Sequence, residues 1–336
     1  MLRKACGAAA LVVVAFTQLS GASRESVARE PTCMAPTSGV RWVSTAPQNE
    51  RGALDRWCAG VGPPAHTSGR HGTDEFVGPL VVVSWNTHAG AGDLDRFVTD
   101  LRAGRLTGRP VADFVVLLQE AYRDGQAPAL DGVEWASAEP VRSLKDRWAA
   151  IDVAGRLGLF GFYVPSMRNG RPSQTREDRG NAILSTRPLA DLTAIELPLE
   201  RQRRVSLAAT VTLSSGRSIR IVCTHFTNMV MHHLWLLSES GRLRQARALG
   251  AQLPKDGPLI VGGDFNAWFG FRDAAYREMA SKLSPPAVND TRATFGPLRL
   301  DHLLFRLPDG WRAEVRRADS KYGSDHYPLI ATIDIR

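Results

Sequence analysis

The stretch from Leu259 to Trp268 carries two polar side chains whose spacing suits chemistry; it reads LIVGGDFNAW. Asp264 and Asn266 are two residues apart, and side chains two apart share a face in extended backbone. Gly262 and Gly263 leave the backbone open to a close neighbour or a ligand. The pattern predicts a carboxylate and a carboxamide together at the end of a buried strand, and an Asx-rich turn is the alternative.

Polar side chains of the same kinds lie at the ends of other strand-like runs. The first group follows its strands and consists of Asn86, Glu120, His225, Asp264 and Asn266. The second group precedes its strands and consists of Asp301, Asp325 and His326. If the last strands run antiparallel to the others, all of these ends meet at one rim. Unpaired charges buried there would cost roughly several kcal/mol each, so a metal ion and an anionic substrate are the expected partners.

These residue types fit phosphate-ester hydrolysis. Asp, Glu and Asn supply the hard oxygen ligands of Mg²⁺ or Mn²⁺, and the chain has no clustered Cys or paired His at zinc-ligand spacing. The imidazole of His326 can take a proton from water if a carboxylate holds it, either Asp325 or one that the fold brings in. His225 can then contact the phosphoryl oxygens or the leaving oxygen. No GxSxG, Walker-type or CxxC motif is present, so water is the expected nucleophile.

The pattern of apolar residues predicts an α+β fold of two packed mixed or antiparallel β-sheets flanked by helices. Strands are expected at 80–86, 114–120, 180–185, 205–213, 218–226, 259–264, 300–305 and 326–335, and helices at 93–101, 243–253 and 272–279. Residues 122–178 are expected to form a long irregular loop with a short strand near 161–164. Residues 79–336 are interpreted as one domain.

The N-terminal residues have the layout of a secretory signal peptide. Arg3 and Lys4 precede an apolar run at 8–16 and a cluster of small residues, so residues 1–22 are predicted to be removed and the protein to be secreted. Residues 23–78 form a lead-in rich in Pro, Gly and Ser. Its Cys33 and Cys58 could form a disulfide in an oxidising compartment, whereas Cys223 is expected to be a buried thiol.

Composition and charge indicate a globular protein with an anionic partner. Of the 336 residues, 43% are apolar and 23% charged, which is enough for a sizeable core. The net charge of +8 comes mostly from Arg and favours phosphate esters, nucleic acid or an anionic lipid surface. No protein partner is indicated, and the chain is expected to be a monomer.

Seven short motifs, in this order, resemble the motif set of the endonuclease/exonuclease/phosphatase superfamily, in particular a secreted bacterial-type member. They are SWN at 84–86, LLQE at 117–120, GNAILS at 180–185, THF at 224–226, GGDFN at 262–266, LDHLLF at 300–305 and GSDHYP at 323–328. The resemblance implies the DNase I-like fold, a four-layer α/β sandwich, for the catalytic domain at 79–336.

The resemblance also implies a role for each matched residue. Glu120 would be the principal Mg²⁺ ligand, with Asn86 near it or at a second metal position. Asp325 would be a metal or orienting carboxylate beside the general base, His326.

The remaining matched residues would act on the water and the phosphate. Asp301 would pair with His326 and fix its tautomer, and Asp264 would orient or help deprotonate the attacking water. Asn266 would hold a phosphoryl oxygen, and His225 would stabilise the transition state. His302, which follows the motif Asp, has no implied role.

Arginines near the strand ends suggest how substrate is held. They lie at 168, 171, 176 and 179 and at 201, 203 and 204. Arg179 and Asn181 are the predicted phosphate contacts among the residues around GNAILS, although solvated loop charge is the commoner fate of such arginines.

The leading hypothesis is a secreted, Mg²⁺-dependent phosphodiesterase that acts on nucleic acid. A sphingomyelinase- or inositol-phosphatase-like hydrolase of lipid or sugar phosphates is the alternative, and an exposed apolar hairpin at 229–237 would favour membrane lipid. The third hypothesis is a non-catalytic extracellular module that binds anions.

Overall fold

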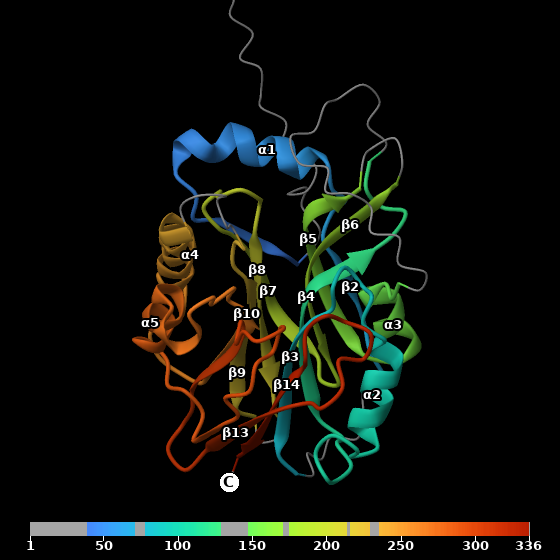
Figure 1. Ribbon diagram of the computed structural model, residues 1–336. Helices are drawn as coiled ribbons and strands as arrows, with labels where there is room; N and C mark the ends of the chain where they lie inside the picture. The colour runs from blue at the N-terminus through green and yellow to red at the C-terminus, as the bar shows by residue number, and fades with distance from the viewer. Residues whose placement is uncertain are drawn as a thin grey trace, which may run out of the picture. The chain divides into compact units, whose positions relative to one another are not determined.

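Two mixed β-sheets pack face to face (Figure 1). The first sheet has the strand order β1 (Arg41–Ser44), β7 (Leu189–Glu196), β8 (Val205–Thr212), β9 (Ser218–His225), β10 (Leu259–Asp264), β12 (Asp301–Arg306). The second has the order β11 (Val288–Asn289), β13 (Arg312–Arg317), β14 (Leu329–Asp334), β3 (Leu80–Asn86), β4 (Phe114–Arg123), β6 (Glu177–Ser185), β5 (Phe160–Asn169), β2 (Ala65–Thr67).

The structure is a computed structural model that describes residues 39–70, 78–128, 147–170, 175–213, 216–228 and 235–335, with the backbone alone for 235–240. The predicted signal peptide and Cys33 lie outside these residues. So do residues 229–234 of the apolar stretch that was expected to discriminate lipid from nucleic acid. All described residues belong to one compact unit, Pro31–Arg336. No helix among them is long and apolar enough to cross a membrane.

Helices cover the outer face of each sheet. The α-helices are α1 (Arg51–Ala59), α2 (Leu94–Arg102), α3 (Ala150–Arg156), α4 (Trp235–Gly250) and α5 (Ala274–Ala280), and short 3₁₀ turns span Gln48–Glu50 and Gly270–Arg272. Residues of α2 and α3 pack on the second sheet, and residues of α4 and α5 pack on the first. The predicted fold class is therefore confirmed.

Strand β3 shows how the sequence produces the sandwich. All seven of its residues are buried, as expected for a strand covered on both faces. Leu80 and Val82 point into the layer between the sheets, whereas Val81, Val83 and Trp85 pack towards α2. The period of two thus distributes one apolar run between two cores.

The glycine pair of the GGDFN motif, in strand β10, lies close to neighbouring side chains and backbone. A Cβ atom at Gly262 would lie 2.5 Å from Leu303 Cδ2 and 2.8 Å from Leu117 Cδ1, which belongs to the opposite sheet. A Cβ atom at Gly263 would lie 1.9 Å from the carbonyl oxygen of Thr224. Both glycines are therefore needed for close neighbours within the protein.

Several elements differ from the sequence prediction. Residues 150–169 form α3 and the ten-residue strand β5 in place of a long loop, and α4 begins earlier than expected. Strands β7 and β13 were not predicted. In β13, which reads RAEVRR, only Ala313 and Val315 supply the inward face, so its apolar signal is weak.

The lead-in contributes edge strands to both sheets. β1 pairs with β7, and β2 pairs with β5. Cys58, in α1, is disulfide-bonded. Its predicted partner Cys33 is not described, so that pairing stays a prediction. Cys223 is a buried free thiol whose pKa burial raises to about 12.

Candidate active site at the rim of the two sheets

Strand register places three of the predicted residues side by side. β10 runs parallel to β9 and antiparallel to β12, so Asp264 is paired with His225 on one side and with Asp301 on the other. The residues that follow their strands and the residues that precede theirs thus meet at one rim. This is expected when the last strands run antiparallel to the others.

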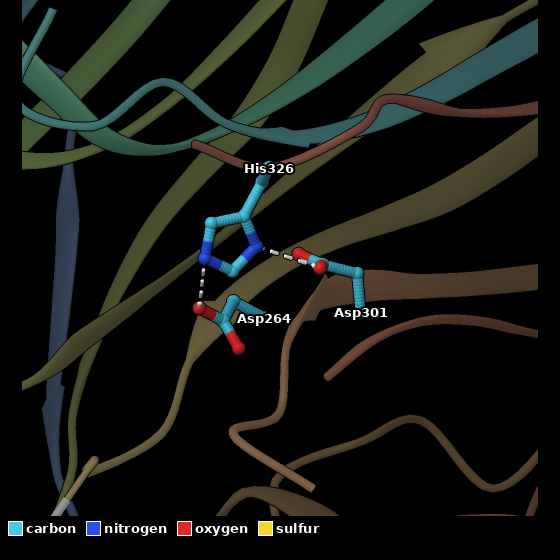
Figure 2. A group of neighbouring side chains, drawn as sticks. All are labelled: Asp264, Asp301 and His326. Carbon is cyan, nitrogen blue, oxygen red and sulfur yellow. Dashed lines mark hydrogen bonds and ion pairs between the residues drawn. The ribbon is translucent and has the colours of Figure 1, made fainter. Parts of the chain in front are cut away.

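Asp301 and His326 form a buried hydrogen-bonded pair. His326 Nδ1 lies 2.8 Å from Asp301 Oδ2, and His326 Nε2 lies 3.9 Å from Asp264 Oδ2. Figure 2 shows the imidazole between the two carboxylates. The carbonyl oxygen of His326 accepts a hydrogen bond from Trp85 Nε1 at 3.2 Å, which fixes the loop that carries the ring.

Charge around this ring favours its protonated form. Burial disfavours the imidazolium, but Asp301, Asp264 and Asp325 outweigh burial and raise the pKa of His326 to about 10. Burial and the neighbouring Asp301 raise the pKa of Asp264 to about 6. The imidazole of His326 therefore carries the proton at neutral pH in the metal-free protein, and Asp264 titrates together with it. A cation bound nearby would lower the pKa of His326, as a base requires.

Asp264, Asp301 and His326 also offer one ligand atom each within 4.8 Å of one another. We interpret the group as a proton-transfer unit, because Nδ1 of His326 is already engaged by Asp301 at hydrogen-bond distance. A hard cation also prefers oxygen ligands to an imidazolium.

His225 is held as a neutral hydrogen-bond donor. Arg204 Nη1 lies 3.1 Å from His225 Nδ1, and a guanidinium can only donate, so Nδ1 accepts and the proton is on Nε2. Nε2 faces Asp264 Oδ2 at 3.4 Å. Burial, followed by the charges of Arg204, His326 and Arg179, holds the pKa of His225 well below its ordinary value. This geometry suits donation to a phosphoryl oxygen better than protonation of a leaving group.

Glu120 is an ionised carboxylate on a strained backbone. Its φ is 48°, at a register shift of β4 between Leu118 and Ala121. A non-glycine residue in this region stores strain, which often marks functional sites. Burial raises the pKa of Glu120, but Arg179, Arg204, His326 and His88 outweigh it, so the pKa is lowered. Arg179 Nη1 lies 3.4 Å from Glu120 Oε2.

Asn86 ties the ends of β3 and β10 together. Its Nδ2 donates to Asp264 Oδ2 at 3.0 Å, and its Oδ1 accepts from the backbone N–H of His88 at 3.0 Å. The hydroxyl of Ser324 donates to the carbonyl oxygen of Asn86 at 2.6 Å, which holds the 324–326 loop at this rim. Asp325 lies 3.6 Å from His88 Nδ1 and is partly exposed.

Glu120, Asn86 and Asp325 carry oxygens of the kind that a hard divalent cation prefers. Glu120 is ionised and partly exposed. The side-chain oxygen Oδ1 of Asn86 accepts one hydrogen bond, from the N–H of His88, and keeps a second lone pair. Sequence reasoning assigned these three residues to Mg²⁺ or Mn²⁺, and the structure brings them to neighbouring strand and loop ends.

Asn266 and Asn181 are both engaged by the fold. Asn266 has φ 48°, its N–H donates to Asp264 Oδ1 at 2.8 Å, and its Nδ2 donates to the carbonyl oxygen of Phe226 at 2.9 Å. Asn181 Nδ2 donates to the carbonyl oxygen of Val205 at 2.8 Å. Each amide nitrogen has a second proton.

A shallow pocket adjoins Glu120. It is lined by Glu120, Ser166, Met167, Arg179, Gly180, Asn181, Arg204 and His225. Two guanidiniums, an imidazole N–H and an amide line one small opening, and donors of this kind attract phosphate oxygens.

Some arginines and histidines do not join the site. Arg203 is buried and its Nε pairs with Glu196 Oε1 at 2.6 Å, so it serves the fold. His302 packs among Phe265, Phe271 and Tyr276, and Arg171 lies outside the described residues.

Sequence reasoning assigned no individual role to three residues that the structure places at the rim, Arg204, His88 and Ser324. Arg204 was noted only as one of a cluster, and its position directly before β8 was the available signal. Ser324 lies in the GSDHYP motif at 323–328, which was the available signal, and His88 has no local signature.

This chain is similar to several known proteins. Residues 83–326 match the model of the endonuclease/exonuclease/phosphatase family. A UPF0294 protein of Vibrio vulnificus is 25% identical over 264 residues, covering 77% of this chain and 78% of that protein. A UPF0294 protein of Vibrio parahaemolyticus is 27% identical over 143 residues, so the match spans 41% of this chain and about half of that relative, 48%.

Among solved structures, an endonuclease/exonuclease/phosphatase from Beutenbergia cavernae superimposes with a TM-score of 0.53 at 18% identity. The match covers 76% of this chain and 72% of that chain. At this identity the likeness concerns the fold, which agrees with the two-sheet architecture described above. The match to the family model covers well over half of the sequence and includes all of the rim residues from Asn86 to His326. The chain therefore belongs to the endonuclease/exonuclease/phosphatase family.

Proposed function

We propose that this protein is a divalent-metal-dependent phosphodiesterase that uses water as nucleophile and nucleic acid as substrate. One observation carries the proposal. The ionised Glu120 and the pocket with Arg179, Arg204 and the neutral His225 lie at the same rim as the Asp301–His326 pair. Family membership indicates a phosphoester hydrolase, and the finer assignment rests on this arrangement.

In the proposed reaction, Glu120, Asn86 and Asp325 hold Mg²⁺ or Mn²⁺. When bound, the ion supplies Lewis-acid stabilisation of charge on the phosphate. Arg179 and Arg204 compensate the negative charge of the phosphodiester.

The protein's own groups prepare the water. His326 accepts its proton at Nε2, the nitrogen that faces Asp264, while Asp301 holds Nδ1–H and fixes the tautomer. Asp264 accepts hydrogen bonds from Asn86 and from the backbone of Asn266, which fix its oxygens for orienting the water.

Charge on the phosphate is met from the other side. His225 donates from Nε2, and Arg204 keeps that proton in place by occupying Nδ1. Asn266 donates a hydrogen bond to a phosphoryl oxygen through the amide hydrogen that does not bond the carbonyl oxygen of Phe226. Preorganised donors of this kind act where charge develops in the transition state.

Nucleic acid is the favoured substrate because the net charge is +8 and arginines line the phosphate pocket. We further propose, from the N-terminal sequence, that the protein is exported. We also propose that it acts as a monomer.

The test is a substrate panel with a matched histidine control. The purified protein is assayed on single-stranded DNA, duplex DNA, RNA, sphingomyelin vesicles and bis(nitrophenyl) phosphate, with Mg²⁺, Mn²⁺ or EDTA. His326→Ala is expected to abolish hydrolysis, whereas His66→Ala, at an exposed position in edge strand β2, is expected to retain it. Hydrolysis that persists in EDTA, or in His326→Ala, would contradict the proposal. Cleavage of sphingomyelin alone would replace nucleic acid with membrane lipid, and binding without turnover would favour an anion-binding module.

A further inference from the structure

A cluster of exposed aromatic side chains directly follows the GGDFN motif. Trp268, Phe269 and Phe271 are 37%, 42% and 36% exposed, and among the described residues Val288 is the other large apolar side chain of comparable exposure. Scattered exposed apolar residues need no explanation, but three within four positions form a patch.

The patch is anchored to the catalytic rim. The backbone N–H of Trp268 donates to the carbonyl oxygen of Asn266 at 2.9 Å, and a 3₁₀ turn at Gly270–Arg272 closes the loop. Trp268 is therefore held two residues from Asn266 and four residues from Asp264, and both of these residues belong to the candidate active site.

A second loop extends the aromatic surface to the general base. The ring of Phe295 lies against that of His326, tilted by 39° with 4.8 Å between centroids, and Phe295 forms a backbone bridge with that residue. The guanidinium of Arg299, from the same loop, lies over Phe271 at 5.9 Å. The two loops thus contact each other beside the site.

Another aromatic ring next to His326, that of Tyr327, is accompanied by cations. The ring of Tyr327, next to His326, has the guanidinium of Arg317 at 3.9 Å and the ammonium of Lys321 at 4.9 Å from its centroid. Aromatic faces interleaved with cations are the surface that single-stranded nucleic acid recognises, because bases stack on the rings and phosphates pair with the cations.

We propose that Trp268 and its neighbouring aromatic residues form a stacking platform that binds unpaired nucleobases next to the scissile phosphate, which makes single-stranded nucleic acid the preferred substrate. The inference rests on the proposed phosphodiesterase function and names its substrate class. Duplex bases already stack on one another and do not offer their faces to such a platform.

The degree of exposure favours bases over a lipid bilayer. Each of the three rings has more than half of its surface covered, so the rings lie against the protein instead of projecting from it. Phe271, for example, packs edge-on against Tyr276 with 5.2 Å between centroids. A supported ring suits stacking, whereas insertion into a membrane requires side chains that protrude.

Binding of labelled oligonucleotides in EDTA tests the platform independently of catalysis. Fluorescence anisotropy gives the Kd for a single-stranded oligonucleotide and for its duplex. Trp268→Ala is expected to weaken single-strand binding by roughly 5- to 100-fold, the range that loss of one base–aromatic stack implies. Trp268→Phe keeps a ring and is expected to retain most of the affinity, and Val288→Ala is the matched control at an exposed apolar position.

Activity separates this inference from the proposed function. In Trp268→Ala, KM for single-stranded DNA should rise while kcat for an abasic single-stranded oligonucleotide, which has no base to stack, stays unchanged. Failure of the wild type to hydrolyse either substrate would refute the phosphodiesterase, with the binding result still deciding the platform. The platform would be overturned if Trp268→Ala left the Kd unchanged, or if single strand and duplex bound with equal affinity. It would also be overturned if Trp268→Ala weakened binding of the protein to sphingomyelin vesicles but not to DNA.

Discussion

Replacing His326 by Gln should change the pH dependence of stability in the metal-free protein. The carboxylates of Asp301, Asp264 and Asp325 favour the imidazolium in the folded state, so the pKa of His326 rises from 6.5 to about 10. A raised pKa stabilises the fold fully below pH 6.5, and the stabilisation is lost as pH rises through 10. Gln has a similar size and cannot carry the charge.

The expected magnitude follows from the two pKa values. A pKa of about 10 in the folded state and 6.5 in the unfolded state gives about 4 kcal/mol at pH 7, which falls below about 1 kcal/mol at pH 10. This is an upper bound, because Asp264 titrates together with His326. Even half of this contribution is a large part of the free energy of unfolding of a typical domain, which is roughly 5–15 kcal/mol.

Urea unfolding in EDTA at pH 7, 8, 9 and 10 measures the effect. The free energy of unfolding of the wild type minus that of His326→Gln should decrease steadily across this range. Packing changes at the substituted position add a constant offset and do not alter the slope. A difference that is independent of pH, or that grows towards pH 10, would refute the assignment of a buried imidazolium paired with Asp301.

Three further predictions test other parts of the rim. Glu120→Gln should weaken Mn²⁺ binding in calorimetry by at least ~10-fold, because it removes an ionised ligand; unchanged affinity would place the metal elsewhere. Arg204→Ala should lower kcat roughly 10²-fold, because His225 loses the donor that fixes its tautomer; normal kcat in a folded variant would argue against that role. Gly262→Ala should lower the free energy of unfolding by about 1–3 kcal/mol, since its Cβ would lie 2.5 Å from Leu303 Cδ2 in the same sheet and 2.8 Å from Leu117 Cδ1 in the opposite sheet; a neutral effect in urea unfolding would contradict these tight contacts.

Local sequence patterns were sufficient for the strands that carry the chemistry. The apolar runs that end in Asn86, Glu120 and Asp264 are buried on both faces, and such runs give a strong signal. The position of Asp301 before its strand correctly indicated the antiparallel direction of β12.

Contacts between distant segments were beyond sequence reasoning. The hydrogen bond between Arg204 and His225 joins two strands of the first sheet, and only the register of β8 and β9 brings them together. The left-handed backbone of Glu120 likewise depends on a register shift of β4 against β6. Glutamate as a residue type does not predict a left-handed backbone conformation.

Spacing alone did not choose the carboxylate for His326, whereas the family resemblance named Asp301. Sequence spacing left open whether Asp325 or a distant carboxylate would hold the imidazole. The structure places Asp301 at 2.8 Å from Nδ1, while Asp325 lies near His88. Adjacent residues in a loop point in different directions, so the neighbour in sequence is not the neighbour in space.

The most direct test of the central claim is the rate of bis(nitrophenyl) phosphate hydrolysis by the purified protein in EDTA, and again after Mg²⁺ or Mn²⁺ is added back. We predict negligible hydrolysis in EDTA, full recovery with the metal, and no recovery in His326→Ala. Equal rates with and without metal, or undiminished hydrolysis by His326→Ala, would contradict a metal-dependent phosphodiesterase at this rim.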